Sequence, residues 1–598
     1  MKDIIHLLPE TVANQIAAGE VIQRPSSAVK ELLENAVDAG STSIELFVKE
    51  SGKTLIRIVD NGCGMSPADA RLSFARHATS KINNAEDLFS IRTKGFRGEA
   101  LASIASIAQV ELKTMQQGAE SGTLIEIEGN QITREEPVGM QSGTTISVKN
   151  LFFNVPARRN FLKSNPIEAR HIVEEFERVA LPHPEIAFLL NVNGNDQYRL
   201  PASNLRQRIV NLYGNPYNER LVPIQEETTL LTISGFVGKP EFARKTRGEQ
   251  FFFVNRRFIK DGYLHHAVTN AFEELLPRDS YASYWLFIDI DPSKIDVNIH
   301  PTKTEIKFED ERAVYAIVRA AVKRSLGQYS VAPALDFDQE KSFDIPHAMR
   351  YQPVQKPSVT VNTGYNPFEK KDNRSIAQAG WQRVYEDIRS TGDLIQPEKQ
   401  ESLELETEPS YREMQAFQSG QFLFAKAPEG VYLFDIIGMH ERIIYHRLLS
   451  NLEKARPSVQ QLLFPVTISL NPSDYQLTKE IEEDIRNLGF DLREFGLNTY
   501  VLHGIPTGIK EGDEKATFEN ILEQFKLNTG MISAGISERI AFSMAKSMAF
   551  RKNQVLSPEE VTALITDFFD LPPGEKGIDG KPCMRLLKNT DLPSLFKA

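Results

Sequence analysis

The sequence has 598 residues, of which 41% are hydrophobic and 25% are charged, and its formal net charge is −11. This length predicts about four domain-sized units, more than one hydrophobic core holds, and the composition is ordinary for a globular protein. The negative balance excludes a generally basic coat for nucleic acid. It leaves room for a local basic groove, because binding depends on where cations cluster.

Other absences narrow the class of protein further. The two cysteines, Cys63 and Cys583, lie far apart in the sequence, which excludes a disulfide framework and any zinc site that needs two neighbouring thiolates. No stretch approaches the roughly 18 uninterrupted apolar residues of a membrane span. Residues 1–22 contain early acids and no long apolar run before a cleavage site, unlike a signal peptide. We therefore expect a cytoplasmic protein.

The segment KELLENAVDAG at residues 30–40 has the apolar spacing of an amphipathic helix. Its expected apolar face comprises Val29, Leu32, Leu33 and Ala36. Its expected polar face comprises Glu31, Glu34, Asn35 and Asp38. Taken alone, this pattern is typical of an ordinary surface helix.

The next two segments alternate as strands and predict an antiparallel hairpin, with residues 43–50 and 54–60 joined by a turn. The second strand ends in Asp60, and the glycines of the sequence DNGCGM follow. Spaced glycines let the backbone approach a ligand, while the carboxylate accepts a hydrogen bond from the amino group of a base. The sequence SGKT at residues 51–54 resembles the end of a phosphate-binding P-loop, but Phe47 occupies the position of the required glycine.

A second glycine pair precedes an apolar helix. Gly95 and Gly98 flank Phe96 and Arg97, and Glu99 opens the sequence EALASIASI. Glycines before a helix start expose backbone N–H groups to an anion, and the helix dipole adds attraction. This segment is therefore a candidate phosphate site.

The sequence changes character from about Pro333 to Pro409. This stretch is rich in Pro, Gln, Asn and charged residues and has no sustained apolar period, so we interpret it as a flexible linker. Within it, residues 375–390 have the pattern of a short helix, either transient or docked through Trp381.

Regular patterns return after the linker. Residues 417–438 predict two strand-like runs around a turn at residues 428–430. Helices are expected over residues 473–489 and 557–570, and the second begins with a Ser557–Glu560 capping box.

Four segments in a fixed order, ELLEN, DNGCGM, GFRGEALASI and GTT at residues 143–145, resemble the nucleotide-binding motifs of the GHKL ATPases. This superfamily includes gyrase B, the ninety-kilodalton heat-shock chaperone, histidine kinases and MutL. The sequences NQIAAGEVIQRPSSAVKELLENAVDAG, ARHATSKI and NVPARRNFL resemble those of MutL, a DNA mismatch repair ATPase. The likeness is dense over the first 330 residues or so and thin beyond about residue 410.

The resemblance implies an α+β, multidomain protein. Residues 1–205 would form a GHKL (Bergerat) ATPase α/β sandwich, and residues 206–332 a transducer subdomain with a ribosomal-protein-type βαβ fold. The flexible linker would cover residues 333–408. Residues 409–598 would form an α/β C-terminal dimerisation domain.

The resemblance also implies a role for each motif residue. Glu31 would be the general base for the water that attacks the γ-phosphate of ATP, and Asn35 would ligate Mg²⁺. Asp60 would bind the adenine amino group with help from Thr144. The other nucleotide and phosphate contacts would come from Gly62, Gly64, Thr79, Ser80, Lys81, Gly95, Phe96, Arg97 and Gly98. Lys303 would reach the γ-phosphate from the second subdomain; the alternative is a solvated lysine at a strand end.

Two basic clusters are the expected contacts with the DNA backbone, which would give salt-sensitive binding without sequence preference. They comprise Arg158, Arg159 and Lys163, and Arg256, Arg257 and Lys260. The alternative is ordinary surface charge. In MutL-like proteins ATP closes two N-terminal domains around a groove, so residues 1–17 would order on closure and slow hydrolysis would act as a timer.

Many MutL proteins carry a metal-dependent nicking site with the pattern DQHAxxExxxxE. The matching stretch here keeps Asp435 and Glu441, but Ile437 replaces the histidine, and a hydrophobic side chain cannot ligate a cation. The family's CPHGRP motif is similar to GIDGKP at residues 577–582, which has no cysteine or histidine. A further metal cysteine, expected near Lys546, is absent. We therefore expect no DNA cleavage by this chain.

The sequence QQLLFP fits the Q-x-x-L-x-P peptide by which such C-terminal domains contact the replication sliding clamp. The matching residues are Gln460, Leu463 and Pro465. The alternative is a strand that enters a turn at Pro465.

Together these features predict a homodimeric Mg·ATP hydrolase that couples mismatch recognition by MutS to strand incision and excision. The implied partners are DNA, MutS, a separate incising endonuclease, a repair helicase and the sliding clamp, with nucleoid association during repair. The first alternative is a nicking endonuclease with a rearranged site at Asp435, His440 and Glu441. A scaffold with an inactive ATPase is another. A topoisomerase subunit or a sensor kinase would need a cleavage module or a phospho-accepting histidine, and neither pattern occurs.

Overall fold

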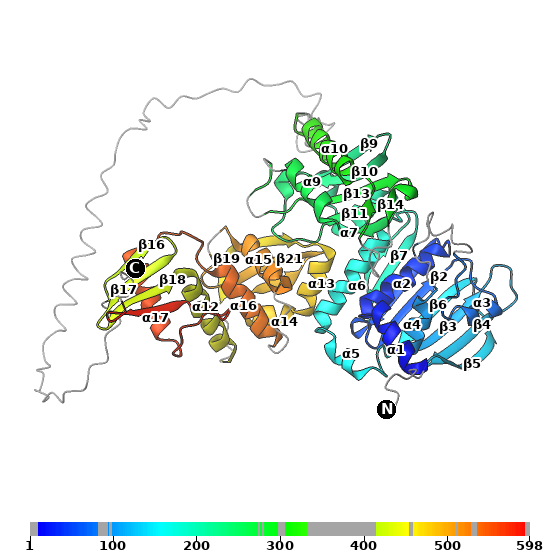
Figure 1. Cartoon of the computed structure of the whole chain (residues 1–598), viewed down its shortest axis with the longest axis horizontal. Coiled ribbons are helices and arrows are strands. Elements are labelled where there is room, and N and C mark those ends of the chain that lie inside the picture. The colour runs from blue at the N-terminus through cyan, green and yellow to red at the C-terminus, as the bar shows by residue number, and fades with distance from the viewer. Residues whose placement is uncertain are drawn as a thin grey trace, which may run out of the picture. The chain divides into compact units, whose positions relative to one another are not determined.

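The computed structural model describes residues 10–81, 94, 98–272, 275–277, 280–296, 305–331, 414–453, 459–509, 512–527 and 535–591 (Figure 1). The linker predicted over residues 333–408 lies outside this described part of the chain. Among the helices of the described ranges, none is both long enough and apolar enough to cross a membrane.

The N-terminal domain is built on an eight-stranded sheet in the order β5-β4-β3-β6-β2-β1-β7-β8. Its strands are β1 (Ser43–Lys49), β2 (Leu55–Asp60), β3 (Gln109–Met115), β4 (Gly122–Glu128), β5 (Gln131–Val138), β6 (Gly143–Lys149), β7 (Ala187–Val192) and β8 (Asn195–Leu200). The predicted hairpin is confirmed, because β1 and β2 pair antiparallel across the short 3-10 helix η1 (Glu50–Gly52). β1 also pairs with β7, and this contact is parallel.

Helices α2, α4 and α6 pack together over one face of this sheet (Figure 1). The helices of the domain are α1 (Glu10–Val21), α2 (Pro25–Asp38), α3 (Pro67–Leu72), α4 (Ala100–Ile107), α5 (Pro156–Phe161) and α6 (Asn165–Ala180). The predicted apolar face of α2 is confirmed: Val29, Leu32, Leu33 and Ala36 are all buried in the core cluster of the domain. Burial of this face, more than helix propensity, stabilises α2.

The second subdomain has a five-stranded sheet in the order β12-β11-β13-β10-β9. Its strands are β9 (Leu221–Glu227), β10 (Leu231–Gly238), β11 (Gln250–Val254), β12 (Arg257–Ile259) and β13 (Tyr284–Ile290). The helices are α7 (Leu205–Tyr213), α8 (Tyr217–Arg220), α9 (Gly262–Phe272) and α10 (Glu311–Val331). Short elements complete it: η3 (Pro240–Phe242), η4 (Pro292–Lys294), β14 (Ile295–Asp296) and β15 (Lys307–Phe308).

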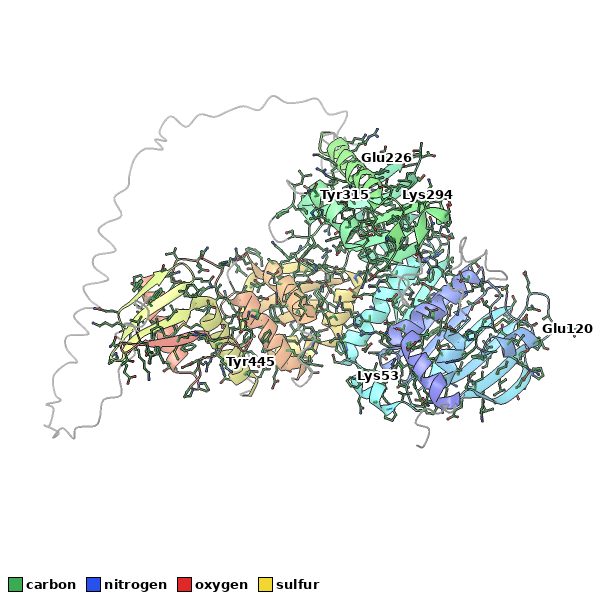
Figure 2. All side chains as sticks on the ribbon, in the orientation of Figure 1. Lys53, Glu120, Glu226, Lys294, Tyr315 and Tyr445 are labelled. Atoms are coloured by element: carbon green, nitrogen blue, oxygen red, sulfur yellow. The ribbon has the colours of Figure 1, made fainter. Side chains whose placement is uncertain are left out.

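The expected βαβ unit is present in this subdomain, since β11 and β13 are parallel neighbours and α9 connects them. One face of the sheet packs on α9 and α10. Glu226 of β9, labelled in Figure 2, pairs with Arg324 of α10 at 3.2 Å. The other face, through Phe251, Phe253 and Trp285, belongs to the core of the ATPase domain. The two N-terminal units therefore share a hydrophobic core.

The described residues of the C-terminal domain form two sheets and two separate cores. One sheet has the order β16-β17-β18-β22 and consists of Ala416–Ser419, Phe422–Ala427, Gly430–Asp435 and Met584–Lys588. The other has the order β19-β21-β20 and consists of Val459–Ser469, Thr499–Pro506 and Asp491–Glu494. The helices are α12 (Ile436–Glu453), α13 (Pro472–Glu480), α14 (Glu482–Asn487), α15 (Glu514–Leu527), α16 (Ile536–Met548) and α17 (Pro558–Phe569).

Two C-terminal predictions need correction and one is confirmed. The helix expected over residues 473–489 is two helices, because the backbone leaves helical geometry at Ile481, with φ −111° and ψ 14°. The first strand-like run divides into β16 and β17 at Gly420, whose φ of +60° suits a tight turn. The Ser557–Glu560 capping box is present at the start of α17.

Candidate active site

Helix α2 carries the polar side chains to which the sequence assigns the chemistry. Pro25 stands in the first turn, where a helix needs no backbone N–H. Leu33 is fully buried on the core side. Glu31, Asn35 and Asp38 are half-buried on the other side, at successive helical turns. One helix therefore presents a carboxylate, an amide and a second carboxylate in a row.

Strand pairing brings together the residues expected to bind adenine. Asp60 and Thr144 are direct partners across β2 and β6. Thr114 is the partner of Thr144 on the next strand, β3, and the two hydroxyl oxygens lie 3.0 Å apart. Thr114 Oγ1 also accepts the N–H of Met65 at 2.9 Å, which ties the glycine-rich segment to β3. Thr114 was not predicted from the sequence, because it belongs to no motif. Only its strand register places it beside Thr144.

The Asp60 carboxylate is oriented by two donors. Its Oδ1 accepts the Gly62 N–H at 2.9 Å and the Ser41 hydroxyl at 3.3 Å. Burial raises the pKa of Asp60 above its ordinary value, and the Gly62 N–H partly opposes this shift. An ionised carboxylate has about four acceptor positions, so capacity remains for the amino group of a base.

The two glycines after Asp60 are required by close packing within the protein. Gly64 has φ +67°, and a Cβ there would lie 2.0 Å from the Met115 carbonyl oxygen. At Gly62 a Cβ would lie 2.8 Å from the Ala39 carbonyl oxygen. No side chain fits at either position. The approach of a base to Gly64 stays a prediction.

At the expected phosphate end, Lys81 lies against the polar side of α2. Its Nζ donates to Asn35 Oδ1 at 2.9 Å and to Asp38 Oδ2 at 2.5 Å. The backbone N–H of Lys81 donates to Thr79 Oγ1 at 3.2 Å, and Ser80 is exposed. The amide of Asn35 and the carboxylate of Asp38 therefore already hold a cation. These are the oxygen ligands that Mg²⁺ prefers, so the residues present fit the implied metal.

Gly98 lies two residues before α4 and has φ +63°, and a Cβ there would lie 2.3 Å from the Ala78 carbonyl oxygen. This contact fixes Gly98 beside the Thr79–Lys81 segment. The other residues expected at the phosphates, Gly95, Phe96, Arg97 and Lys303, lie outside the described residues. Their roles stay predictions.

The first basic cluster lies on and after α5, which has no buried residue. Arg159 is exposed, whereas Arg158 is half-buried and donates to the Gly19 and Ile22 carbonyl oxygens near the end of α1. Lys163 is half-buried. Arg159 is therefore the residue of this cluster most accessible to a DNA phosphate.

The second basic cluster divides between the surface and the interior. Arg256 and Lys260 are exposed, and Arg256 pairs with Glu185 at 3.0 Å. Arg257 is half-buried and donates to the Lys94 carbonyl oxygen at 3.2 Å. The Arg257 guanidinium therefore faces the ATPase domain.

In the C-terminal domain, Asp435 ends β18, and His440 and Glu441 lie in the first turns of α12. Glu441 pairs with Lys546 at 3.0 Å; burial raises the pKa of Glu441, and the Lys546 ammonium opposes the rise. His440 Nδ1 accepts the Phe550 N–H at 3.1 Å, and burial lowers the pKa of His440 to about 4. The Lys546 ammonium thus occupies Glu441, and the Phe550 N–H occupies Nδ1 of His440, two of the three side chains of the rearranged site.

The sulfur of Cys583 also makes an internal contact, with its thiol donating to the Glu575 carbonyl oxygen at 3.5 Å. Burial raises the pKa of the Cys583 thiol, which disfavours the thiolate that a metal needs. Within the described part of the chain, no group of three or more His, Cys, Asp or Glu side chains is arranged to hold a metal ion.

The QQLLFP segment interrupts the pairing of β19 with β21. The register shifts between Gln461 and Val466, so the intervening residues leave the ladder. Leu463 is 87% exposed and Phe464 is 78% exposed, which is unusual for large apolar side chains. Gln460 and Pro465 are also exposed. This peptide is therefore accessible to a partner.

The four-stranded sheet has a second face that points away from its core. Leu423 and Ala425 face the core, and the alternate residues of β17 and their cross-strand partners form the opposite face. Phe417 and Phe424 stack there with ring centroids 4.9 Å apart. We call this surface the apolar sheet face, after its apolar residues Phe417, Phe422, Phe424, Val431, Leu433 and Leu587. The same register also places Ser419, Lys426, Asp435 and Arg585 on it.

Three family models match consecutive parts of the chain. The model described as Histidine kinase-, DNA gyrase B-, and HSP90-like ATPase matches residues 23–151, which contain α2, β2 and β6. The model DNA mismatch repair protein, C-terminal domain, matches residues 209–327. The model MutL C terminal dimerisation domain matches residues 415–556. The N-terminal domain is thus an ATPase of the histidine kinase, gyrase B and HSP90-like class.

Full-length relatives narrow this class to one family. DNA mismatch repair protein MutL of Christiangramia forsetii is 45% identical over 593 residues, 95% of this chain and 96% of that protein. MutL of Phocaeicola vulgatus is 41% identical over 622 residues, with 100% of both chains covered. The Aquifex aeolicus MutL ATPase domain complexed with ADP is 28% identical, covers 46% of this chain and 94% of that one, and has a TM-score of 0.36. The chain belongs to the MutL family of DNA mismatch repair proteins.

Proposed function

We propose that this chain is a homodimeric, Mg·ATP-driven matchmaker that couples mismatch recognition by MutS to strand incision and excision. The observation that carries the proposal is the placement of Glu31 and Asn35 on α2, in the same ATPase-type domain as the Asp60–Thr144 pair, which lies where β2 ends and β6 begins. A base and a metal ligand are parts that phosphoryl transfer from ATP uses, and an adenine acceptor selects the nucleotide.

Each of these side chains takes one task. Glu31 orients the attacking water and accepts its proton. Asn35 would hold magnesium through its amide oxygen, which accepts a hydrogen bond from the Lys81 ammonium in this structure. Bound magnesium neutralises phosphate charge. Asp60 accepts from the adenine amino group, with Thr144 beside it.

The nucleotide bound to the ATPase domain then controls how the protein engages DNA. ATP closes two N-terminal domains around the duplex, with residues 1–17 ordering on closure, and slow hydrolysis times the engagement of partners. The exposed side chains Arg159, Arg256 and Lys260 contact phosphates without reading sequence, so affinity falls as salt rises. Cytoplasmic protein is thereby recruited to the nucleoid during repair.

The C-terminal domain serves as the permanent dimer contact and as a docking site. A second copy covers the apolar sheet face, in agreement with the dimerisation model that matches residues 415–556. The sliding clamp binds the exposed peptide through Gln460, Leu463 and Pro465. A separate endonuclease and a repair helicase act downstream.

Asp60→Asn tests the nucleotide site. It replaces an acceptor oxygen by a donor, so ATP and ADP affinity should fall about tenfold to a hundredfold, the range for a hydrogen bond to a charged group. Titration with a fluorescent nucleotide measures the loss, and ATP-dependent association with MutS on mismatched DNA should fall in parallel. Asp196→Asn, at an exposed position of β8, is the matched control. Unchanged affinity in Asp60→Asn would exclude Asp60 from adenine recognition.

A nicking endonuclease is the second candidate, because Asp435 Oδ1 is buried with no hydrogen-bond partner among the described residues. The Glu441–Lys546 pair favours the matchmaker without nicking activity, because the Lys546 ammonium occupies the Glu441 carboxylate that a metal ion would need. Supercoiled plasmid with Mn²⁺ and ATP should therefore stay intact with this protein. Nicking that Asp435→Asn abolishes would establish the endonuclease instead.

A further inference from the structure

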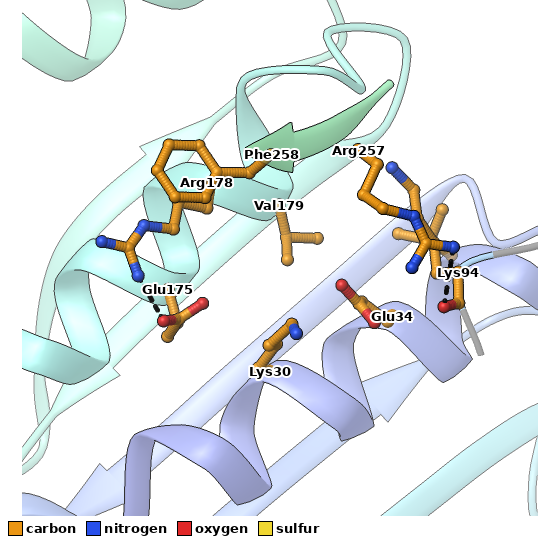
Figure 3. A pocket seen from close by; sticks show the side chains of 9 residues that line it. Lys30, Glu34, Lys94, Glu175, Arg178, Val179, Arg257 and Phe258 are labelled. Atoms are coloured by element: carbon orange, nitrogen blue, oxygen red, sulfur yellow. Dashed lines mark hydrogen bonds and ion pairs between the residues drawn. The ribbon is translucent and has the colours of Figure 1, made fainter. Parts of the chain in front are cut away.

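Lys94 lies between α2 of the ATPase domain and the turn that joins β11 to β12 (Figure 3). Its backbone N–H donates to Asp38 Oδ1 at 3.1 Å. Its carbonyl oxygen accepts from the Arg257 guanidinium at 3.2 Å, and its ammonium donates to the Arg256 carbonyl oxygen. We call this set of contacts, made by Asp38, Lys94, Arg256 and Arg257, the Lys94 junction.

The junction lies beside a small cavity. Figure 3 shows Glu34 on α2, between Lys30 on one side and Lys94 with Arg257 on the other. The cavity measures about 20 Å³, room for about one water, so it is not a site for an organic ligand. Burial lowers the pKa of Lys94 to about 8, and Glu34 opposes this shift. An ammonium buried at such a cost needs specific partners, and the junction supplies them.

Lys94 connects the second subdomain to residues of the candidate ATP site. Lys94 directly precedes the GFRGE segment that the sequence assigns to the phosphates, and that segment leads into α4. Asp38 holds both Lys94 and Lys81, which flank the phosphate side of α2. The β11–β12 turn, with φ +48° at Asn255 and +63° at Arg256, has the hand that two-residue hairpins favour, so it is a rigid support.

We propose that Lys94 is a positioning residue through which the second subdomain supports the polar side of α2, where Asp38 accepts both the Lys94 N–H and the Lys81 ammonium. The inference rests on the proposed ATP chemistry and assigns Arg257 a task besides DNA contact. Arg257 acts before any DNA is bound, by holding the Lys94 carbonyl oxygen. ATP turnover therefore depends on a residue of the second subdomain that touches no nucleotide.

The first test measures ATP turnover by the full chain without DNA. Lys94→Met and Arg257→Met should each lower kcat about tenfold, the size of one lost charge-assisted hydrogen bond, with KM for ATP and ADP affinity changed less than about threefold. Lys94→Arg, which can still donate to the Arg256 carbonyl oxygen, should recover most of the loss. The exposed residues Lys49 and Arg324 supply matched controls as Lys49→Met and Arg324→Met.

The second test needs no nucleotide and separates this inference from the proposed function. Hydrogen exchange of the nucleotide-free chain should speed up in peptides from residues 31–40 and 98–107 in Arg257→Met, and stay unchanged in β7 and β8. Faster exchange there supports the junction even if the wild type hydrolyses no ATP. The inference would be overturned if Arg257→Met weakens DNA binding but leaves ATP turnover and hydrogen exchange as in the wild type.

Discussion

Glu31→Gln is expected to lower kcat for ATP hydrolysis at least about a hundredfold, because positioned general bases contribute about 10²–10⁴ to rate. Glutamine keeps the size and polarity of the side chain but cannot accept the proton of the attacking water. Binding does not depend on that proton, so ADP and ATP affinity should stay within about threefold. Phosphate release and a nucleotide titration on the same preparation measure the two quantities separately.

Two comparisons make this result specific to Glu31. Glu128→Gln changes an exposed glutamate of the same domain and should leave turnover intact. Glu34→Gln tests the other carboxylate of the motif, which Figure 3 shows beside Lys94 and Arg257, and its loss should be smaller than that of Glu31→Gln. If Glu31→Gln hydrolyses ATP at the wild-type rate, the chain either uses another base or is a scaffold whose turnover has no role.

The elements that carry the site could be predicted because each is encoded by neighbours in the sequence. Apolar spacing over residues 30–40 predicted α2 and its buried face, and alternation over residues 43–60 predicted the β1–β2 hairpin. The Ser557–Glu560 capping box predicted the start of α17. In each case the chemistry that forms the element acts over a few residues.

Contacts between distant segments could not be predicted in this way. Thr114 lies beside Thr144 because β3 pairs with β6 in one register, and a shift by one residue would remove the contact. Lys94 meets the second subdomain through tertiary packing, and Lys546 meets Glu441 from another helix. No local pattern shows which lysine meets which carboxylate or carbonyl group. The sequence motifs therefore located the site. The residues that position it could be identified only from the three-dimensional structure.

Phe424→Asp is expected to convert the dimer to a monomer by weakening association about a thousandfold. Phe424 lies between Phe417 and Leu433 on the apolar sheet face, so an aspartate there would be desolvated by the partner copy. Loss of a central aromatic contact costs about 2 kcal/mol or more. A two-fold interface contains the residue twice, which gives about 4 kcal/mol. Sedimentation velocity over a concentration series measures the shift.

The fold should survive this change, because Phe424 points away from the core that Leu423 and Ala425 build, and an unchanged melting temperature of the C-terminal transition would check that. Phe495→Asp is the matched control, since Phe495 is 66% exposed and lies outside the apolar sheet face. Dissociation by Phe495→Asp, or an undiminished dimer in folded Phe424→Asp, would place the interface elsewhere. If the face is the interface, Phe424→Asp should keep Mg·ATP binding while losing ATP-driven closure on DNA, because closure requires two ATPase domains held at high effective concentration.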